Sequence, residues 1–228
     1  QASKEGARIV SMPGINDELF ENGGMTADYN ALQREISGMG SVFRRKRRVR
    51  VTTPSGTDIE FRTGGRWVLE DNGICNRPGQ VSNLPAGKVF VLPNEGTMNG
   101  TIVIDGSWEG SLLDDPLTFK VEEGLVVEAS GGDLAAEIGS IFELAKASLR
   151  GARRELVWTV AEFGIGMNPK ALNIVGNKLE DQVVRGSAYF GFGDNTHLGG
   201  SARVGFHLRG VMRDPSVTLE DSSLINEG

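Results

Sequence analysis

Two stretches of the chain place apolar residues at the spacing of an amphipathic helix, residues 25–43 and 132–151. The apolar stripe of the first stretch consists of Tyr29, Leu32, Ile36 and Met39. The stripe of the second stretch consists of Leu134, Ile138, Ile141, Ala145 and Leu149. Thr26 and Asp133 have side chains that suit an N-cap, and Gly151 suits the end of the second helix. The pattern therefore predicts two long helices.

Alternation of apolar and polar residues with period two predicts β-strands over most of the remaining chain. Residues 48–71 form a hairpin and a third strand, interrupted by turns at 54–56 and 64–65. Residues 117–131 form a second hairpin that turns at 122–124. The other predicted elements are strands at 7–15, 88–93, 100–106, 155–166, 183–194, 201–212 and 216–221, a short helix at 179–184 and a frayed tail at 221–228.

Together these elements predict an α+β fold, with a mostly antiparallel, β-rich domain and a few helices. The first residues differ from the rest in their predicted secondary structure, because a strand and a helix precede the long run of strands. We interpret residues 1–43 as the end of a truncated N-terminal α/β domain and residues 44–228 as a β-rich C-terminal domain.

The composition is that of a globular protein, with 39% hydrophobic and 24% charged residues and a net charge of −6. This acidic balance argues against a general nucleic-acid binder. The one basic block, residues 44–48, is either a patch for phosphate or an acidic partner, or a solvated turn. The single cysteine, Cys75, excludes an internal disulfide framework and agrees with a reducing, cytoplasmic location. No apolar run reaches the ~18 residues of a membrane span, so no membrane partner is expected.

Several blocks, in matching order and spacing over essentially the whole chain, resemble the aminopeptidase T family of metallopeptidases. These blocks are residues 49–61, 83–106, 161–171, 176–195 and 204–221. Ring-opening dihydroxypyridine dioxygenases resemble the same fold group. The resemblance implies a C-terminal domain that holds metal ions and a homodimer.

The same resemblance implies a metal site that is altered in this chain. The two metal-binding glutamates of the family fall on Lys88 and Glu162, and a family histidine falls on Tyr189. A histidine and an aspartate two residues apart fall on His207 and Arg209. Glu162 and His207 therefore remain as metal ligands if a metal is retained, and the other three positions carry lysine, tyrosine and arginine.

The altered positions change what the site attracts. Protonated Lys88 and Arg209 have no free lone pair for a metal, and both repel a dication. His207 and Arg209 are two residues apart in a predicted strand, so both face the same side. We expect a former metal site rebuilt as an anion-binding or salt-bridged pocket. No cofactor is expected, with zinc, manganese, cobalt or iron as the alternatives if the family site survives.

Further residues near these positions are candidates for the same pocket. The candidate catalytic residues are Glu162, His207 and Tyr189, and the candidate ligand-binding residues are Lys88, Arg209, Glu95, His197 and Asp194. Glu95 is the nearest carboxylate that could replace the one missing at residue 88. His197 lies in a glycine-rich loop, where it is either catalytic or simply exposed, and Asp194 could be a turn former instead.

Three functions remain in view. The leading interpretation is a non-catalytic or repurposed module that binds a peptide, a carboxylate-bearing molecule or a protein partner, with no nucleic acid involved. The second is a metal-dependent aminopeptidase, in which metal-activated water cleaves a peptide. The third is a non-heme iron, ring-cleaving dioxygenase-like enzyme, whose set of histidine and carboxylate ligands would lose one member at Arg209.

Overall fold

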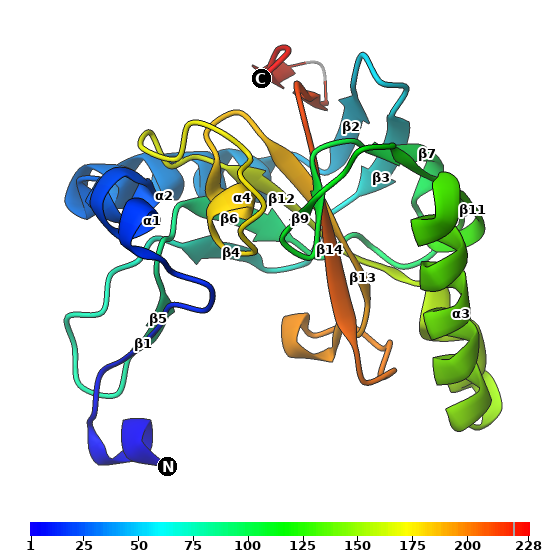
Figure 1. Ribbon diagram of the computed structural model, residues 1–228, viewed down its shortest axis with the longest axis horizontal. Helices are drawn as coiled ribbons and strands as arrows, with labels where there is room; N and C mark the ends of the chain where they lie inside the picture. Colours follow the sequence, from blue (N-terminus) through cyan, green and yellow to red (C-terminus); the bar gives the residue numbers. More distant parts are fainter. Residues whose placement is uncertain (221) are drawn as a thin grey trace.

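Two antiparallel sheets of seven strands pack face to face in the computed structural model, which describes residues 1–220 and 222–228 (Figure 1). The first sheet contains, in order, β11 (Leu125–Ser130), β10 (Leu117–Glu122), β7 (Asn99–Ile104), β3 (Asp58–Arg62), β2 (Arg48–Thr52), β15 (Ser216–Leu219) and β16 (Ser222–Ile225). The second contains β4 (Val68–Asp71), β6 (Lys88–Val91), β12 (Val160–Gly166), β13 (Ala188–Gly193), β14 (His207–Met212), β8 (Ser107–Trp108) and β9 (Ser111–Leu112). A separate parallel pair joins β1 (Ile9–Ser11) to β5 (Val81–Asn83). The predicted α+β, mostly antiparallel fold is confirmed.

The core between the two sheets follows from the alternation of residues along their strands. Phe61 of β3 projects into it, and its ring centroid lies 5.2 Å from that of Phe163 in β12 and 6.2 Å from that of Phe190 in β13. Aromatic pairs at such distances add about 0.5–1.5 kcal/mol to the stabilisation from burial alone. Because side chains alternate across a strand, the intervening residues of β12 and β13 face away from this core.

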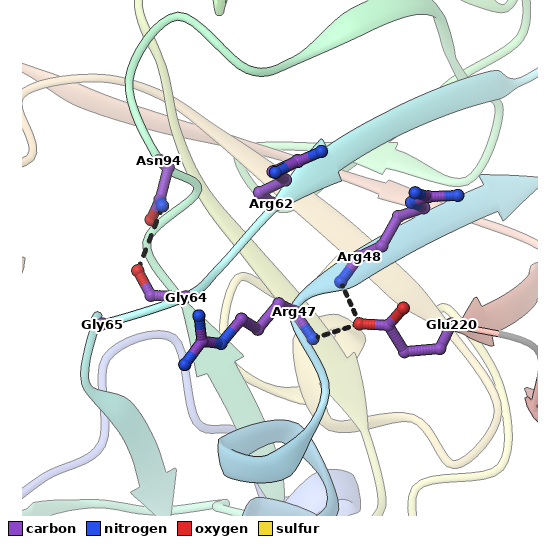
Figure 2. A pocket seen from close by; sticks show the side chains of 7 residues that line it. All are labelled: Arg47, Arg48, Arg62, Gly64, Gly65, Asn94 and Glu220. Carbon is purple, nitrogen blue, oxygen red and sulfur yellow. Dashed lines mark hydrogen bonds between the residues drawn. The ribbon is translucent and has the colours of Figure 1, made fainter.

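Helices cover the outer parts of the sheets (Figure 1). The helices are α1 (Asp17–Asn22), α2 (Tyr29–Arg45), α3 (Gly132–Ser148) and α4 (Glu180–Val183). Helix α2 packs on β4 and β6, and α3 packs on β10 and β11. The basic block 44–48 spans the end of α2 and the start of β2, where its last two arginines border a cavity (Figure 2). Within the described residues, no helix combines the length and the apolar character needed to cross a bilayer.

The long helices begin and face differently from the prediction in three details. Asp28, not Thr26, caps α2, since its side chain accepts hydrogen bonds from two amide groups of the first turn. The N-cap of α3 is Gly131, and Asp133 lies within the first turn. The buried face of α3 is formed by Ala135, Ile138 and Phe142. Ile141 of the predicted stripe is 42% exposed, because the largest side chain of the helix, Phe142, takes the core position one residue further on.

Some predicted boundaries were also wrong. Helix α1 was not predicted. The first four residues of the strand predicted at 155–166 belong to a 3-10 helix, Gly151–Trp158, and the strand begins at Val160. The tail predicted to be frayed forms β16, which pairs with β15. The end of the strand predicted at 216–221 falls on a residue outside the described ranges. For the tail, tertiary pairing with β15 decides the outcome, and local pattern does not reveal it.

The environment of the Tyr29 phenol, at the start of α2, can be tested by titration in alkaline solution. Its hydroxyl donates to the carbonyl oxygen of Gly24 at 2.9 Å, and burial raises the pKa of its phenol to about 12. A group whose pKa is raised on folding contributes stability that is present below the unfolded pKa, near 10, and is lost as the pH rises toward 12. We expect Tyr29→Phe to remove one phenol titrating near pH 12 from the absorbance at 295 nm. A loss of one phenol titrating near pH 10 would contradict this.

Candidate functional site

The outer face of the second sheet carries a buried polar cluster. Along β12 and β13, aromatic and aliphatic residues face the core, whereas Glu162, Gly164, Tyr189 and Gly191 alternate with them and face outward. Each of these strand residues is buried. The sequence pattern that alternates glycine with phenylalanine therefore gives the sheet a large apolar inner face. On the outer face, the glycines leave room for the few polar side chains there.

The register of three strands brings Glu162 and Arg209 together. Glu162 of β12 is opposite Gly191 of β13, and Gly191 is opposite Arg209 of β14. Because Gly191 has no side chain, the side chain of Arg209 can pass over β13 and reach Glu162 on β12. A Cβ at Gly191 would lie 2.6 Å from Nε2 of His207 and 3.0 Å from Cβ of Glu162. This glycine is required for the close approach of the three side chains.

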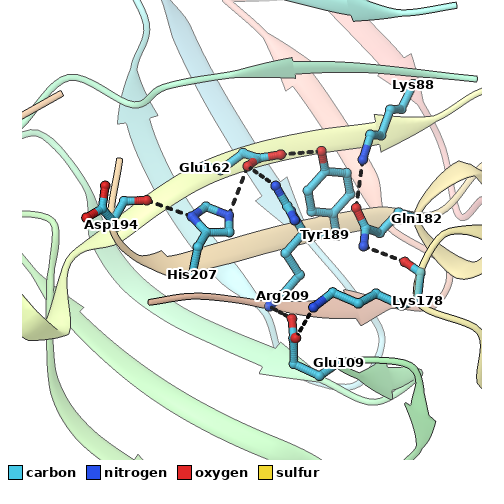
Figure 3. A network of polar contacts seen from close by, with 9 residues as sticks. All are labelled: Lys88, Glu109, Glu162, Lys178, Gln182, Tyr189, Asp194, His207 and Arg209. Atoms are coloured by element: carbon cyan, nitrogen blue, oxygen red, sulfur yellow. Dashed lines mark hydrogen bonds and ion pairs between the residues drawn. The ribbon is translucent and has the colours of Figure 1, made fainter. Parts of the chain in front are cut away.

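Glu162 is the centre of the cluster (Figure 3). Its side chain is fully buried. The hydroxyl of Tyr189 donates to Oε1 at 2.5 Å, and a terminal nitrogen of Arg209 donates to Oε2 at 2.9 Å. Nε2 of His207 lies 3.0 Å from the same Oε2. The expectation that His207 and Arg209 face the same side of their strand agrees with this arrangement.

Neighbouring positive charge keeps Glu162 ionised. Burial by itself raises the pKa of this carboxyl, but His207, Arg209 and Lys88 together outweigh burial and hold the pKa far below its usual range. Burial, followed by the charge of Glu162, raises the pKa of the Tyr189 phenol well above its ordinary value. At neutral pH the cluster therefore contains a carboxylate and a neutral phenol that donates to it.

The backbone carbonyl of Asp194 orients the ring of His207. Its Nδ1 lies 2.7 Å from the backbone carbonyl oxygen of Asp194, and because a carbonyl only accepts, Nδ1 carries a proton. In the protonated ring, Nε2–H points at Oε2 of Glu162 and contributes to the low pKa of that carboxyl. In the neutral ring with the proton on Nδ1, Nε2 presents its lone pair toward Glu162 instead. Nε2 is buried and makes no hydrogen bond of good geometry with any described residue. A lone pair 3.0 Å from a carboxylate oxygen is repulsive unless a proton or a cation lies between them.

His197 completes a set of three donors. Its ring centroid lies 5.0 Å from that of His207. Glu162, His197 and His207 each offer one ligand atom, and all of these atoms lie within 4.8 Å of one another. Burial, followed by the charges of His207 and Arg209, lowers the pKa of His197, which favours the neutral ring that a metal requires.

Lys88 occupies the neighbouring part of the same face. Its Nζ is buried, donates to Oε1 of Gln182 at 2.7 Å and lies 5.1 Å from the ring centroid of Tyr189. Burial lowers the pKa of this amine, an effect partly offset by Asp71 on the adjacent strand. Burial also raises the pKa of Asp71, with Lys88 and Arg209 opposing that shift. The lysine is thus one strand away from Glu162 and is held by an amide instead of by the carboxylate.

Sequence reasoning missed the residues that support this cluster. Glu109 accepts the backbone N–H of Arg209 at 2.6 Å and pairs with the side chain of Lys178. Glu109 and Gln182 come from a tight turn and a short helix, and Asp71 from an edge strand. The strand alternation at 68–71 was a usable signal for Asp71, whereas nothing local distinguishes Glu109.

The predicted site residues divide into two groups. The structure brings together Glu162, Tyr189, His207, Arg209, His197, Lys88 and the backbone of Asp194. Asp194 itself uses its carboxylate within the loop, accepting from Thr196, Val204 and Gly205. Glu95 does not join the cluster, because its carboxylate pairs with Arg66 and accepts from Ser201. The missing carboxylate is therefore not replaced by Glu95.

Gly164 provides a stability test of the packing of the Tyr189 ring on the outer face of the sheet. A Cβ at this position would lie 2.2 Å from Cε1 of the fully buried Tyr189 ring, so Gly164→Ala is expected to lower the free energy of unfolding by about 2 kcal/mol. Urea denaturation measures the change. The matched control is Gly139→Ala in α3, where nothing lies within 4 Å of the new Cβ and helix propensity adds about 0.5–1 kcal/mol. Unchanged stability of Gly164→Ala would show that Tyr189 does not lie over this glycine.

The donor set fits a single divalent metal ion in the type of its ligand atoms. Two histidines and one carboxylate form the facial set typical of non-heme iron(II) sites. A carbonyl behind a ligating histidine, as at His207, is the usual second partner of such a ligand. Arg209 opposes the fit, because its guanidinium already binds Oε2 of Glu162. In the structure the guanidinium is the partner of Oε2, so a metal at this site would compete with it for that oxygen.

Comparisons with known proteins place this geometry in context. The family model described as NicX, 2,5-dihydroxypyridine 5,6-dioxygenase, matches residues 1–228. The protein of that name from Pseudomonas putida KT2440 is 22% identical over 211 residues, which cover 86% of this chain and 57% of that protein. A solved structure of 2,5-dihydroxypyridine dioxygenase from the same strain superposes with a TM-score of 0.81 and 21% identity, over 99% of this chain and 65% of that one.

A second solved structure, wild-type AmpT from Thermus thermophilus, superposes with a TM-score of 0.62 and 15% identity, over 98% of this chain and 61% of that one. At these identities the structural likenesses show the fold alone. The chain spans between 57% and 65% of the length of the relatives it matches.

Proposed function

The chain belongs to the 2,5-dihydroxypyridine 5,6-dioxygenase family, and from that premise we propose that it opens an electron-rich aromatic ring with dioxygen at one iron(II) ion. The observation that carries the proposal is the convergence of Glu162, His197 and His207, with ligand atoms within 4.8 Å of one another. The family assignment corrects the sequence-based emphasis on aminopeptidase T. The likeness of this chain to that protein is limited to the fold.

The proposal assigns each side chain a separate task. Glu162, His197 and His207 would hold the metal, and iron(II), when bound, supplies the redox chemistry that dioxygen insertion into a ring requires. The carbonyl of Asp194 keeps His207 in the tautomer that leaves Nε2 free. Tyr189 fixes one oxygen of Glu162, so that only the other oxygen faces the histidines and Arg209.

Arg209 is the proposed partner of an ionised group on the ring. Its Nε is buried and has no acceptor among the described residues, and its side chain is 21% exposed. A guanidinium presents donors in a fixed fork that matches a carboxylate or a pair of ring oxygens. Binding such a group would draw Arg209 away from Oε2 of Glu162 and release that oxygen for a metal.

The experiment combines metal analysis with a reaction assay. Protein stripped of metal and then loaded anaerobically with iron(II) in the presence of 2,5-dihydroxypyridine, which would displace Arg209 from Glu162, is expected to retain one ion per chain. His197→Ala is expected to bind iron at least tenfold more weakly under the same conditions. Oxygen uptake and loss of ring absorbance with 2,5-dihydroxypyridine test the reaction. His197 is the informative position, because an exposed loop histidine without a role would leave both measurements unchanged.

A second function rests on a specific observation, the ion pair between Arg209 and Glu162. If the guanidinium permanently replaces the metal, the chain is a module that binds a carboxylate-bearing molecule, a peptide or a protein partner. Failure to retain any divalent ion, together with saturable binding of benzoate that is lost in Arg209→Gln, would favour this function over the dioxygenase.

A further inference from the structure

A cavity of about 450 Å³ lies at the open end of the β2–β3 hairpin, in the first sheet, separate from the cluster around Glu162 (Figure 2). Its lining residues are Arg47, Arg48, Arg62, Gly64, Gly65, Asn94 and Glu220. Three arginines therefore line one cavity in a chain whose net charge is −6. A volume in this range is typical of small-molecule sites.

The arginines are arranged at an electrostatic cost to the fold. Arg48 and Arg62 are directly opposite each other in the β2–β3 register, and like charges at opposite positions of an antiparallel pair destabilise it. The next outward-facing pair in the same hairpin joins opposite charges, because Arg50 is opposite Glu60. Arg50 also binds both carboxylate oxygens of Asp58. An anion between Arg48 and Arg62 would turn the unfavourable pair into a favourable one.

The cavity has one carboxylate, Glu220, against three arginines, which leaves an excess of two positive charges. One oxygen of Glu220 accepts the backbone N–H groups of both Arg47 and Arg48, at 2.9 and 3.2 Å. Arg48 approaches a second carboxylate, Glu60, at 3.5 Å, where both side chains are more than half exposed and the pair contributes little. In the described part of the chain, no carboxylate lies within ion-pair distance of Arg47 or Arg62.

The glycine turn beside these arginines offers further donors. Gly65 has a φ of +77°, and the amide groups of Gly64 and Gly65 have no acceptor among the described residues. Consecutive amides in a turn with a left-handed residue are a recurring anion-binding arrangement. Asn94 fixes this turn, because its side-chain amide donates to the carbonyl oxygen of Gly64 at 3.0 Å.

We propose that this cavity binds the phosphate group of a small molecule, with Arg47, Arg48 and Arg62 as its charged donors. Guanidinium groups match phosphate oxygens in geometry and bind them through charge-assisted hydrogen bonds. The cavity is larger than one phosphate ion requires, so the ligand can be a phosphate monoester as well as inorganic phosphate. This site is independent of the proposed ring-cleavage function.

Calorimetric titration with inorganic phosphate, and separately with phenyl phosphate, at constant ionic strength tests the proposal. Saturable binding is expected in the wild type, weakened at least tenfold in Arg62→Gln and in Arg47→Gln. Tighter binding of phenyl phosphate assigns the site to a monoester, whereas equal or weaker binding assigns it to the inorganic ion, and either result supports the site.

Arg50→Gln is the matched control, because Arg50 is exposed on the same hairpin but is paired with Asp58 outside the cavity. It is expected to leave the affinity within twofold of the wild type. Absence of saturable binding in a wild type whose thermal unfolding is cooperative would overturn the proposal. An equal loss in Arg50→Gln and Arg62→Gln would also overturn it, since general charge attraction would then account for binding.

Discussion

Glu162→Gln is expected to lower the free energy of unfolding by about 3 kcal/mol or more, the largest stability effect that the cluster predicts. The amide preserves the shape of the side chain but removes its charge. Arg209 then loses the carboxylate that pairs with it at 2.9 Å, and Tyr189 loses the ionised acceptor of its hydroxyl. Removing one member of a buried ion pair costs more than the pair itself contributes, because the other charge stays desolvated. Urea denaturation at neutral pH measures the change.

Two further variants identify the cause. Glu95→Gln also breaks a pair with an arginine, but the carboxylate of Glu95 is 45% exposed, so the expected change is below about 1 kcal/mol. The double variant Glu162→Gln, Arg209→Met is expected to be more stable than Glu162→Gln alone, because it leaves no unpaired guanidinium. If the single variant is as stable as the wild type, Glu162 is not the counter-ion of a buried cation.

Much of the fold could be predicted because the relevant signals are local. Period-two alternation gives the β2–β3 and β10–β11 hairpins, and the stripe through Leu32 and Ile36 gives α2. The errors fall where packing partners distant in sequence decide the outcome. The tail becomes β16 only because β15 is available to pair with it, and the face of α3 is set by the core that Phe142 enters. The division into domains at residue 43 stays a prediction.

The candidate site could be predicted only in part, for a related reason. Glu162, Tyr189, His207 and Arg209 lie on three adjacent strands of the sheet, so their meeting follows once those strands are paired. His197 comes from the loop between β13 and β14, whose path no residue pattern fixes. Glu109 reaches Arg209 through a pairing of residues 100 positions apart in the chain. Sequence spacing identifies chemistry carried by strands better than chemistry carried by loops.

Arg209→Asp is expected to tighten the binding of iron(II), or of manganese(II) as a redox-stable substitute, at least 100-fold. Two unit charges 4 Å apart interact by about 4 kcal/mol at an effective dielectric of 20, and a +1/+2 pair by twice that amount. The substitution removes such a repulsion, frees Oε2 of Glu162 and adds a carboxylate on the strand that carries His207. A 100-fold change corresponds to only about 2.7 kcal/mol, well within the available energy. Calorimetric titration of metal-free protein measures it.

The control for net charge is Arg185→Asp, which makes the same substitution at an exposed arginine paired with Glu35 and is expected to leave the metal affinity unchanged. Weaker or equal metal affinity in Arg209→Asp would contradict the competition between guanidinium and metal for one carboxylate oxygen. A gain confined to Arg209→Asp would instead mean that one residue determines whether this cluster holds an ion or an internal salt bridge. The ring-cleavage proposal would then require a ligand that displaces Arg209 before the metal can bind tightly, because both compete for the same oxygen of Glu162.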